Sequence, residues 1–287
     1  MGFKIVSDSS SNVFSLEGVN YTTVPMKVIA GEREFIDTPA LDLQDMVTTL
    51  RNHKGTSGSS CPNVQEWLDA FEGEDDVFGL TISKNLSGSY NSAKQAAEEY
   101  METHPGRRVY IFDSLAAGPQ QIMLADKLGQ LIAEGHDFDT IVEKALDYHN
   151  HTHILFCLES MNNLARNGRV SPAAAKIASV LGIRAVGDVK GGLITPVHKL
   201  RGHKKAVATL VEMLEERGLK EDGYVRIAHC FGQQQAEDLK AATLAKHPGV
   251  RFVIEPTSAL CSFYAEAGGL MIGMEGDYNT NNNNKDF

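Results

Sequence analysis

The sequence predicts an α/β protein made of two lobes with mostly parallel sheets. Short apolar runs, about as long as buried strands, alternate with longer segments in which apolar residues recur at helical spacing, and this alternation is typical of βαβ units. The alternation starts again after residue 158, and 287 residues are enough for two domains. We therefore expect an N-terminal α/β domain over 1–158, a C-terminal α/β domain over 159–276 and a disordered, Asn-rich tail over 277–287.

In the first domain, strands are expected where short apolar runs end at turn residues. These runs are Phe3–Val6, Tyr21–Ala30 and Arg33–Ile36 (a hairpin turning at Gly31), Val77–Ile82 and Arg108–Phe112. Helices are expected where apolar residues follow a helical repeat. These segments are Leu41–Leu50, the stretch carrying Val64, Trp67, Leu68 and Phe71, and then Ser89–Tyr100, Pro119–Glu134 and Phe138–Tyr148.

The second domain repeats the pattern. Its expected strands are Ile154–Leu158, Ile183–Val189 and Leu193–Lys199 (a hairpin around Gly191-Gly192), Tyr224–Phe231, Val250–Glu255 and Gly269–Met274. Its expected helices are Met161–Ala165, one that starts with Ser171 as cap and Pro172 at the first position, Lys204–Glu216, Gln234–Lys246 and Ser258–Glu266. Two lobes of similar size thus meet near residue 158, and pockets favour such junctions.

Composition and charge exclude several classes of protein. Hydrophobic residues make up 42% of the chain and charged residues 22%, as in ordinary soluble proteins. The formal net charge of −10 argues against a nucleic-acid partner, which needs a concentrated basic surface. No apolar run approaches the ~18 residues of a membrane span, and no signal-peptide core follows Met1, so we expect no membrane insertion and a cytoplasmic location.

The turn Ser83–Gly88 is the most informative stretch of the chain. It lies where a predicted strand ends and a helix begins, and unpaired backbone N–H groups with the positive end of the helix dipole attract anions there. Ser87 and Ser89 add hydroxyls that can donate to a bound oxyanion, and Gly88 lets a ligand approach the backbone closely. The alternative is that Ser87 or Ser89 merely caps the helix, and the pattern leaves both interpretations open.

Further hydroxyl-rich turns follow the same logic. Ser9–Ser11 and Asp113-Ser114 come directly after predicted strands, and the loop 55–63 ends at a helix start. In a parallel sheet these turns meet at one edge, where ligands bind. Asp8 and Asp113 could form an acid–base pair or simply cap the elements that follow them.

No motif for catalysis or metal binding stands out. The chain has no G-x-x-x-x-G-K-[ST], G-x-G-x-x-G, H-E-x-x-H or G-x-S-x-G segment, so we name no catalytic residue and no cofactor. His149, His151 and His153 occupy alternate positions, and two such residues on a strand can bind a metal ion. Because no carboxylate or cysteine lies nearby, we expect an exposed turn instead. The four cysteines form no C-x-x-C pair, so we expect reduced thiols and no metal.

Taken together and in order, these segments resemble the DegV family of fatty-acid-binding proteins over about residues 3 to 275. The matching segments are Phe3–Ser9, Ser59–Asn63, Ser83–Tyr90, Asp113-Ser114 with Gly118, Asn167–Ser171 and Lys199–Gly202. The resemblance implies a long-chain fatty acid in a buried tunnel between two α/β domains, with its carboxylate near the Ser-rich turns of the first domain. The fatty acid is then a ligand, and no cofactor is implied.

The same resemblance assigns residues to roles. The fatty-acid-binding residues would be Ser59, Ser60, Ser87 and Gly88, with the hydroxyls of Ser59 and Ser87 bonding the carboxylate. Arg169 would hold structure near the carboxylate end. Some members hand the bound acid to a fatty acid kinase, and Arg201 stands where the family has an arginine that serves this partner contact.

Two departures from the family pattern bear on these roles. Ser59 replaces a threonine and keeps the hydroxyl, whereas Tyr264 stands where many members carry a histidine. Lipid binding is compatible with both changes, but the kinase partnership stays open. The other function that the residues allow is an enzyme acting on a small phosphorylated substrate at the same anion site.

Overall fold

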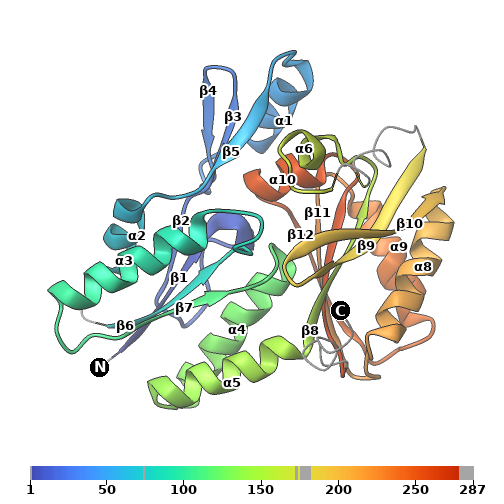
Figure 1. Ribbon diagram of the computed structural model, residues 1–287. Coiled ribbons are helices and arrows are strands. Elements are labelled where there is room, and N and C mark those ends of the chain that lie inside the picture. The colour runs from blue at the N-terminus through green and yellow to red at the C-terminus, as the bar shows by residue number, and fades with distance from the viewer. Residues whose placement is uncertain (1, 74, 172–173, 175–181, 278–287) are drawn as a thin grey trace.

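The computed structural model describes residues 2–73, 75–171, 174 and 182–277. It has two lobes, each built on its own β-sheet with helices packed against it, and a small third sheet that extends from the first lobe (Figure 1). The predicted two-lobed α/β class is therefore confirmed. Residue 278 onward, the main part of the predicted tail, lies outside the described residues.

The first-lobe sheet has four parallel strands, as predicted. In spatial order they are β2 (Tyr21–Val24), β1 (Phe3–Asp8), β6 (Asp76–Thr81) and β7 (Val109–Asp113). Successive residues face opposite sides: Val6 packs with α2 (Val64–Phe71) and α3 (Ser89–Thr103), whereas its neighbour Ile5 packs with α4 (Pro119–Ala133) and α5 (Phe138–Asn150).

The predicted hairpin over residues 21–36 is split at Pro25. β2 joins the parallel sheet, while β3 (Lys27–Ala30) and β4 (Arg33–Ile36) form the small sheet with their turn at Gly31. A strand that the sequence did not predict, β5 (Ser57–Ser60), pairs antiparallel with β3. It is followed by α2, and α1 (Leu43–Asn52) comes between β4 and β5. Pro25 lacks the N–H that an uninterrupted strand needs, which explains why the predicted strand over residues 21–30 is divided into β2 and β3.

The second-lobe sheet has six strands and differs from the prediction, because most of its pairs are antiparallel. Its strands in spatial order are β10 (Leu193–Arg201), β9 (Ile183–Lys190), β8 (Thr152–Leu158), β13 (Leu270–Glu275), β11 (Tyr224–His229) and β12 (Arg251–Pro256). Only β11 and β12 pair in parallel. The last strand, β13, inserts between β8 and β11 and is antiparallel to both of them.

The helices of the second lobe divide between two faces. α8 (His203–Glu216) and α9 (Gln233–Leu244) cover the outer face, and α6 (Asn162–Arg166) and α10 (Ala259–Ala265) lie toward the first lobe (Figure 1). The helix predicted to start at Ser171-Pro172 falls mostly outside the described residues. The Ser171 hydroxyl does accept the Ala174 amide at 3.2 Å, as a cap does.

Helix α4 joins the lobes, since it packs against β1 and β6 on one side and against β8, β11 and β13 on the other. A side chain at Gly273 would lie 2.9 Å from the Met123 sulfur, so glycine is needed for this close approach. Arg226 of β11 donates to Asp126 of α4 at 2.7 Å and adds an ion pair across the joint. Among the described helices, none combines the length and apolar character of a membrane span.

Candidate functional site

A cavity of about 290 Å³ lies between the two lobes and the small sheet. This volume is close to the lower end of the ~300–1,000 Å³ range of small-molecule sites. Its second-lobe wall is apolar, because alternate residues of β8 turn inward while their neighbours pack under α8 and α9. The apolar side chains of this wall are Ile154, Phe156, Leu158, Val189, Ile194 and Met271.

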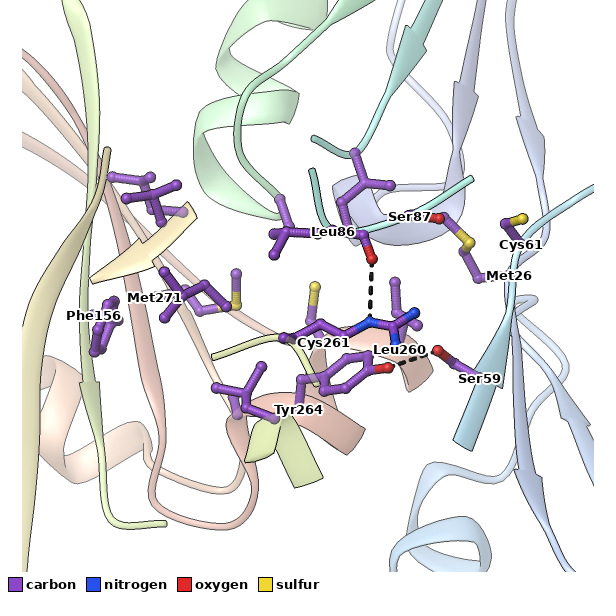
Figure 2. A pocket seen from close by; sticks show the side chains of 18 of the residues that line it. Met26, Ser59, Cys61, Leu86, Ser87, Phe156, Leu260, Cys261, Tyr264 and Met271 are labelled. Atoms are coloured by element: carbon purple, nitrogen blue, oxygen red, sulfur yellow. Dashed lines mark hydrogen bonds between the residues drawn. The ribbon is translucent and has the colours of Figure 1, made fainter. Parts of the chain in front are cut away.

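The polar side chains of the cavity gather at the other end. Figure 2 shows Ser59 and Ser87 on the side of the first lobe and the small sheet, with Phe156 and Met271 across the cavity from them. All four predicted fatty-acid-binding residues line this cavity, and they are Ser59, Ser60, Ser87 and Gly88. The site thus pairs an apolar wall with hydroxyls at one end.

The Ser87 hydroxyl is oriented by its own turn. The amides of Leu86 and Ser87 donate to the Ser83 carbonyl at 2.9 and 3.1 Å, which closes the turn. The Ser87 hydroxyl oxygen accepts the Ser89 amide at 3.2 Å, so its own proton is available to donate into the cavity. The N-cap position of α3 is Gly88, but the Ser87 hydroxyl accepts the amide of the first helical residue, so Ser87 supports the start of the helix and also lines the cavity.

Backbone approaches the cavity closely at Gly88. A side chain there would lie 3.3 Å from the Cys61 sulfur, so a larger residue would press on the opposite wall. Because Gly88 is the N-cap of α3, the positive end of the helix dipole lies at this end of the cavity. The turn therefore lies at the cavity, and anion binding there stays a prediction.

Ser89 does not line the cavity. It is fully buried, and its hydroxyl donates to Asp8 at 2.7 Å. Asp113 accepts the amides of Lys84 and Leu115 at 3.2 and 3.0 Å. Asp8 and Asp113 are each bonded to other groups, so the acid–base pair that the sequence allowed is not formed.

Tyr264 and Ser59 form a hydrogen bond that the sequence analysis missed. Their hydroxyl oxygens are 2.8 Å apart, which ties α10 of the second lobe to β5 of the small sheet (Figure 2). The two residues are 205 positions apart, and no local pattern connects them. Tyr264 therefore places a phenol at the polar end of the cavity.

Arg169 brings a positive charge to the cavity wall. Its Nε donates to the Leu86 carbonyl at 3.2 Å, and Nη1 donates to the Asn167 carbonyl. Leu86 belongs to the turn that carries Ser87, so the guanidinium links that turn to the second lobe. This contact fits the expectation that Arg169 holds structure near the polar end.

Arg201 does not reach the cavity. It is exposed at the end of β10, opposite Ile183, whereas the cavity-lining Ile194 pairs with Val189 near the other end of the hairpin. At ~3.3 Å per residue the two ends are more than about 20 Å apart. A role of Arg201 in partner binding stays a prediction.

The histidines predicted to lie in an exposed turn are mostly buried. His149 lies in the last turn of α5 with 9% of its surface exposed, and His153 lies within β8 with 6% exposed. The error arose because the helix and the strand meet with almost no loop between them. In the described part of the chain, no group of three or more His, Cys, Asp or Glu side chains could hold a metal ion.

The fold and the site define a class, a two-lobed α/β protein with an apolar cavity that is polar at one end. The family model described as "Uncharacterised protein, DegV family" matches residues 2–275. A DegV domain-containing protein of Streptococcus gordonii is 35% identical over 280 residues, which cover 96% of this chain and 99% of the relative. The chain belongs to the DegV family.

Two solved structures of similar proteins cover 96% of this chain and all of their own chains. A DegV family protein from Eubacterium eligens, loaded with heptadecanoic acid, has a TM-score of 0.93 at 34% identity. The Streptococcus pneumoniae Fatty Acid Kinase (Fak) B3 protein, loaded with linoleic acid, has a TM-score of 0.93 at 35% identity. Both of these similar proteins thus hold a long-chain fatty acid.

Proposed function

We propose that this protein binds a long-chain fatty acid in the cavity between its lobes. The observation that supports this most is that apolar side chains from both lobes, such as Leu86 and Phe156, line most of the cavity, while its hydroxyls and the Arg169 guanidinium gather at one end. The ligands of the two similar DegV structures fit the same chemistry, since each has one acid group and one long apolar chain.

The apolar tail supplies most of the binding free energy. Burying ~14 methylenes at ~0.8 kcal/mol each gives roughly 11 kcal/mol before the costs of association. Those costs subtract several kcal/mol and leave room for sub-micromolar binding. The tail contacts are not directional, so the hydrogen-bonding groups at the polar end of the cavity determine the orientation of the bound acid.

The carboxylate lies at the polar end of the cavity in this proposal. A buried carboxylate without partners is very costly, so it needs several donors. The Ser87 hydroxyl has a free proton, Ser59 and Ser60 add hydroxyls, and Gly88 exposes the start of α3. The guanidinium of Arg169 offsets the negative charge.

The first test is organic extraction of the purified protein followed by mass spectrometry. Long-chain acids near one per chain support the proposal, and their absence, together with no binding of added acid, contradicts it. In titrations, Ser87→Ala should weaken acid binding by about 1–3 kcal/mol, the cost of removing one partner of a buried charged group. Ser92→Ala, which removes a hydroxyl one turn further along α3 and outside the cavity, is the matched control.

An enzyme acting on a small phosphorylated substrate, the other function that the sequence allowed, is supported less well. Such a substrate is polar throughout, and the wall from Ile154 to Leu158 offers it no partner. We do not propose a catalytic residue or a cofactor. A competition experiment with inorganic phosphate separates the two functions. A site for phosphorylated substrates should bind phosphate by itself, whereas added phosphate should not displace a fatty acid whose affinity comes mainly from its tail.

The acid is presented to a fatty acid kinase through the exposed surface around Arg201 in this proposal. The name of the similar Streptococcus pneumoniae protein, Fatty Acid Kinase (Fak) B3, supports such a partnership. Arg201 is exposed and outside the cavity. Arg201→Ala should therefore slow acyl phosphate formation by the kinase and leave acid affinity unchanged, and a loss of acid affinity would reject this assignment.

A further inference from the structure

A buried carboxylate lies directly beneath the turn that carries Ser87. Asp8 ends β1 in the middle of the first-lobe sheet, next to β6, and has no exposed surface. Burial raises the pKa of Asp8, while hydrogen bonds from Gln121, Ser10, Ser89 and Ile82 oppose that rise. A carboxylate at this depth has to have a full set of donors.

The two oxygens of Asp8 face different parts of the lobe. Oδ1 accepts the Ser10 hydroxyl at 2.5 Å and the Gln121 amide at 2.9 Å, so it is fixed to the body of the domain. Oδ2 accepts the Ile82 amide at 2.9 Å and the Ser89 hydroxyl at 2.7 Å. Ile82 and Ser89 flank the turn Ser83–Gly88, called the cavity turn below, so Oδ2 of Asp8 holds both ends of it.

Ser89 connects this carboxylate to the cavity. Its hydroxyl is used by Asp8, and its amide donates to the Ser87 hydroxyl oxygen at 3.2 Å. Ser89 itself is fully buried and absent from the cavity lining. A displacement of Ser89 therefore reaches the ligand through its neighbours, and its hydrogen bond to the Ser87 hydroxyl is the most direct route.

We propose that Asp8 and Ser89 are positioning residues for the carboxylate grip, acting through Ser87 without touching the ligand. The inference rests on the proposed function, since it concerns how the same site recognises an acid. Its physical basis is the narrow range of a good O–H···O contact, about 2.5–3.0 Å between oxygens. Four groups at hydrogen-bond distance make Asp8 a rigid base for the turn.

The test compares a long-chain acid with its methyl ester, because the ester keeps the tail and lacks the charge. Ser89→Ala should lower acid affinity about 5–20-fold and change ester affinity less than about 2-fold. In the double variant Ser87→Ala/Ser89→Ala, acid affinity should equal that of Ser87→Ala alone, because Ser89 acts only through Ser87. Additive losses would show that Ser89 acts independently and would overturn the inference.

Two further variants exclude a general loss of structure. Thr243→Val removes a fully buried hydroxyl that bonds within α9, far from the cavity, and should leave both affinities unchanged. Ser89→Cys keeps the approximate size of the side chain and a weak donor, so its acid affinity should lie between those of the unmodified protein and of Ser89→Ala. If the alanine variant does not fold, the cysteine variant is used in its place.

The possible outcomes separate the two proposals. Failure of the unmodified protein to bind either ligand rejects the proposed function and this inference with it. Acid binding that weakens in Ser87→Ala but not in Ser89→Ala rejects the inference alone. Equal losses of acid and ester affinity in Ser89→Ala also reject it, since they show a disturbed cavity instead of a disturbed grip.

Discussion

At the scale of single residues, His149 couples stability to pH. Its imidazole lies in the last turn of α5, and its Nδ1 has no hydrogen-bond partner among the described residues. Burial lowers the pKa of His149 to about 4, because the charged form loses its hydration. In the unfolded chain the pKa of histidine is about 6.5, so the unfolded state binds the proton first as pH falls. Stability is therefore lost between pH 6.5 and 4.

We expect this histidine alone to contribute about 2 kcal/mol of destabilisation between pH 7 and pH 4.5, from the pKa of about 4 set by burial. Urea unfolding at both pH values measures it. His149→Gln should lose about that much less stability than the unmodified protein over this range, and the same change at the partly exposed His151 is the control. An identical pH dependence in His149→Gln and the unmodified protein would contradict the assignment.

The residues that line the polar end of the cavity were predicted better than the hydrogen bonds that hold them in place. Ser59, Ser60, Ser87 and Gly88 were predicted to bind the ligand, and all line the cavity. The turn carrying Ser87 and Gly88 could be recognised locally, whereas the choice between a ligand site and a helix cap, and the roles of Ser59 and Ser60, came from the resemblance to the family. The Ser59–Tyr264 bond joins residues 205 positions apart, and only the packing of α10 against the small sheet brings them together.

At the scale of elements, the tip of the β9–β10 hairpin holds the cavity turn from the second lobe. Ser83 and Asn85 of the turn donate to the carbonyls of Gly192 and Gly191 at 2.9 and 2.7 Å. Both glycines have positive φ, +80° and +55°. A side chain at Gly192 would overlap the Ser83 hydroxyl, whereas one at Gly191 would meet nothing.

This difference makes a matched pair of variants. Gly191→Ala should cost about 1–2 kcal/mol of stability, the cost of a left-handed conformation with a side chain. Gly192→Ala carries the same backbone cost and in addition displaces Ser83, so it should cost at least about 1 kcal/mol more. Urea unfolding of both variants measures the difference. Equal losses would mean that the tip contact does not contribute to stability.

Local patterns predicted most elements and failed where pairing decides. The helices over α3, α4 and α5 follow from their apolar repeats, and the Gly31 and Gly191-Gly192 turns are where the glycines placed them. β5 was missed, because Ser57–Ser60 has no apolar alternation and becomes a strand only by pairing with β3. In the second sheet the antiparallel β9–β10 hairpin was predicted, but the pairing of β8 with β9 and the insertion of β13 between β8 and β11 join segments that are distant in the sequence, which no local pattern encodes.

At the scale of the whole molecule, the two lobes are joined too extensively to unfold separately. α4 packs on both sheets, Arg226 bonds Asp126 across the joint, and Asp37 of the first lobe accepts the amide of Ala259 in α10 at 2.8 Å. These contacts are buried or half-buried, so unfolding one lobe exposes surface of the other. We therefore expect one cooperative transition.

The single tryptophan provides the measurement. Trp67 is fully buried in the first lobe, so its fluorescence reports that lobe alone, whereas far-UV circular dichroism reports both. The two unfolding curves in urea should coincide within error. A fluorescence transition that precedes or follows the dichroism transition would show that the lobes unfold independently.

The divided lining of the cavity has a consequence for the cargo itself. An acid that occupies it contacts side chains of both lobes, so in the proposed complex the lipid links the two lobes to each other. Loading at 100 times the dissociation constant adds about 2.7 kcal/mol to stability. Release of the lipid should therefore lower the stability of the protein and loosen the contact between its lobes.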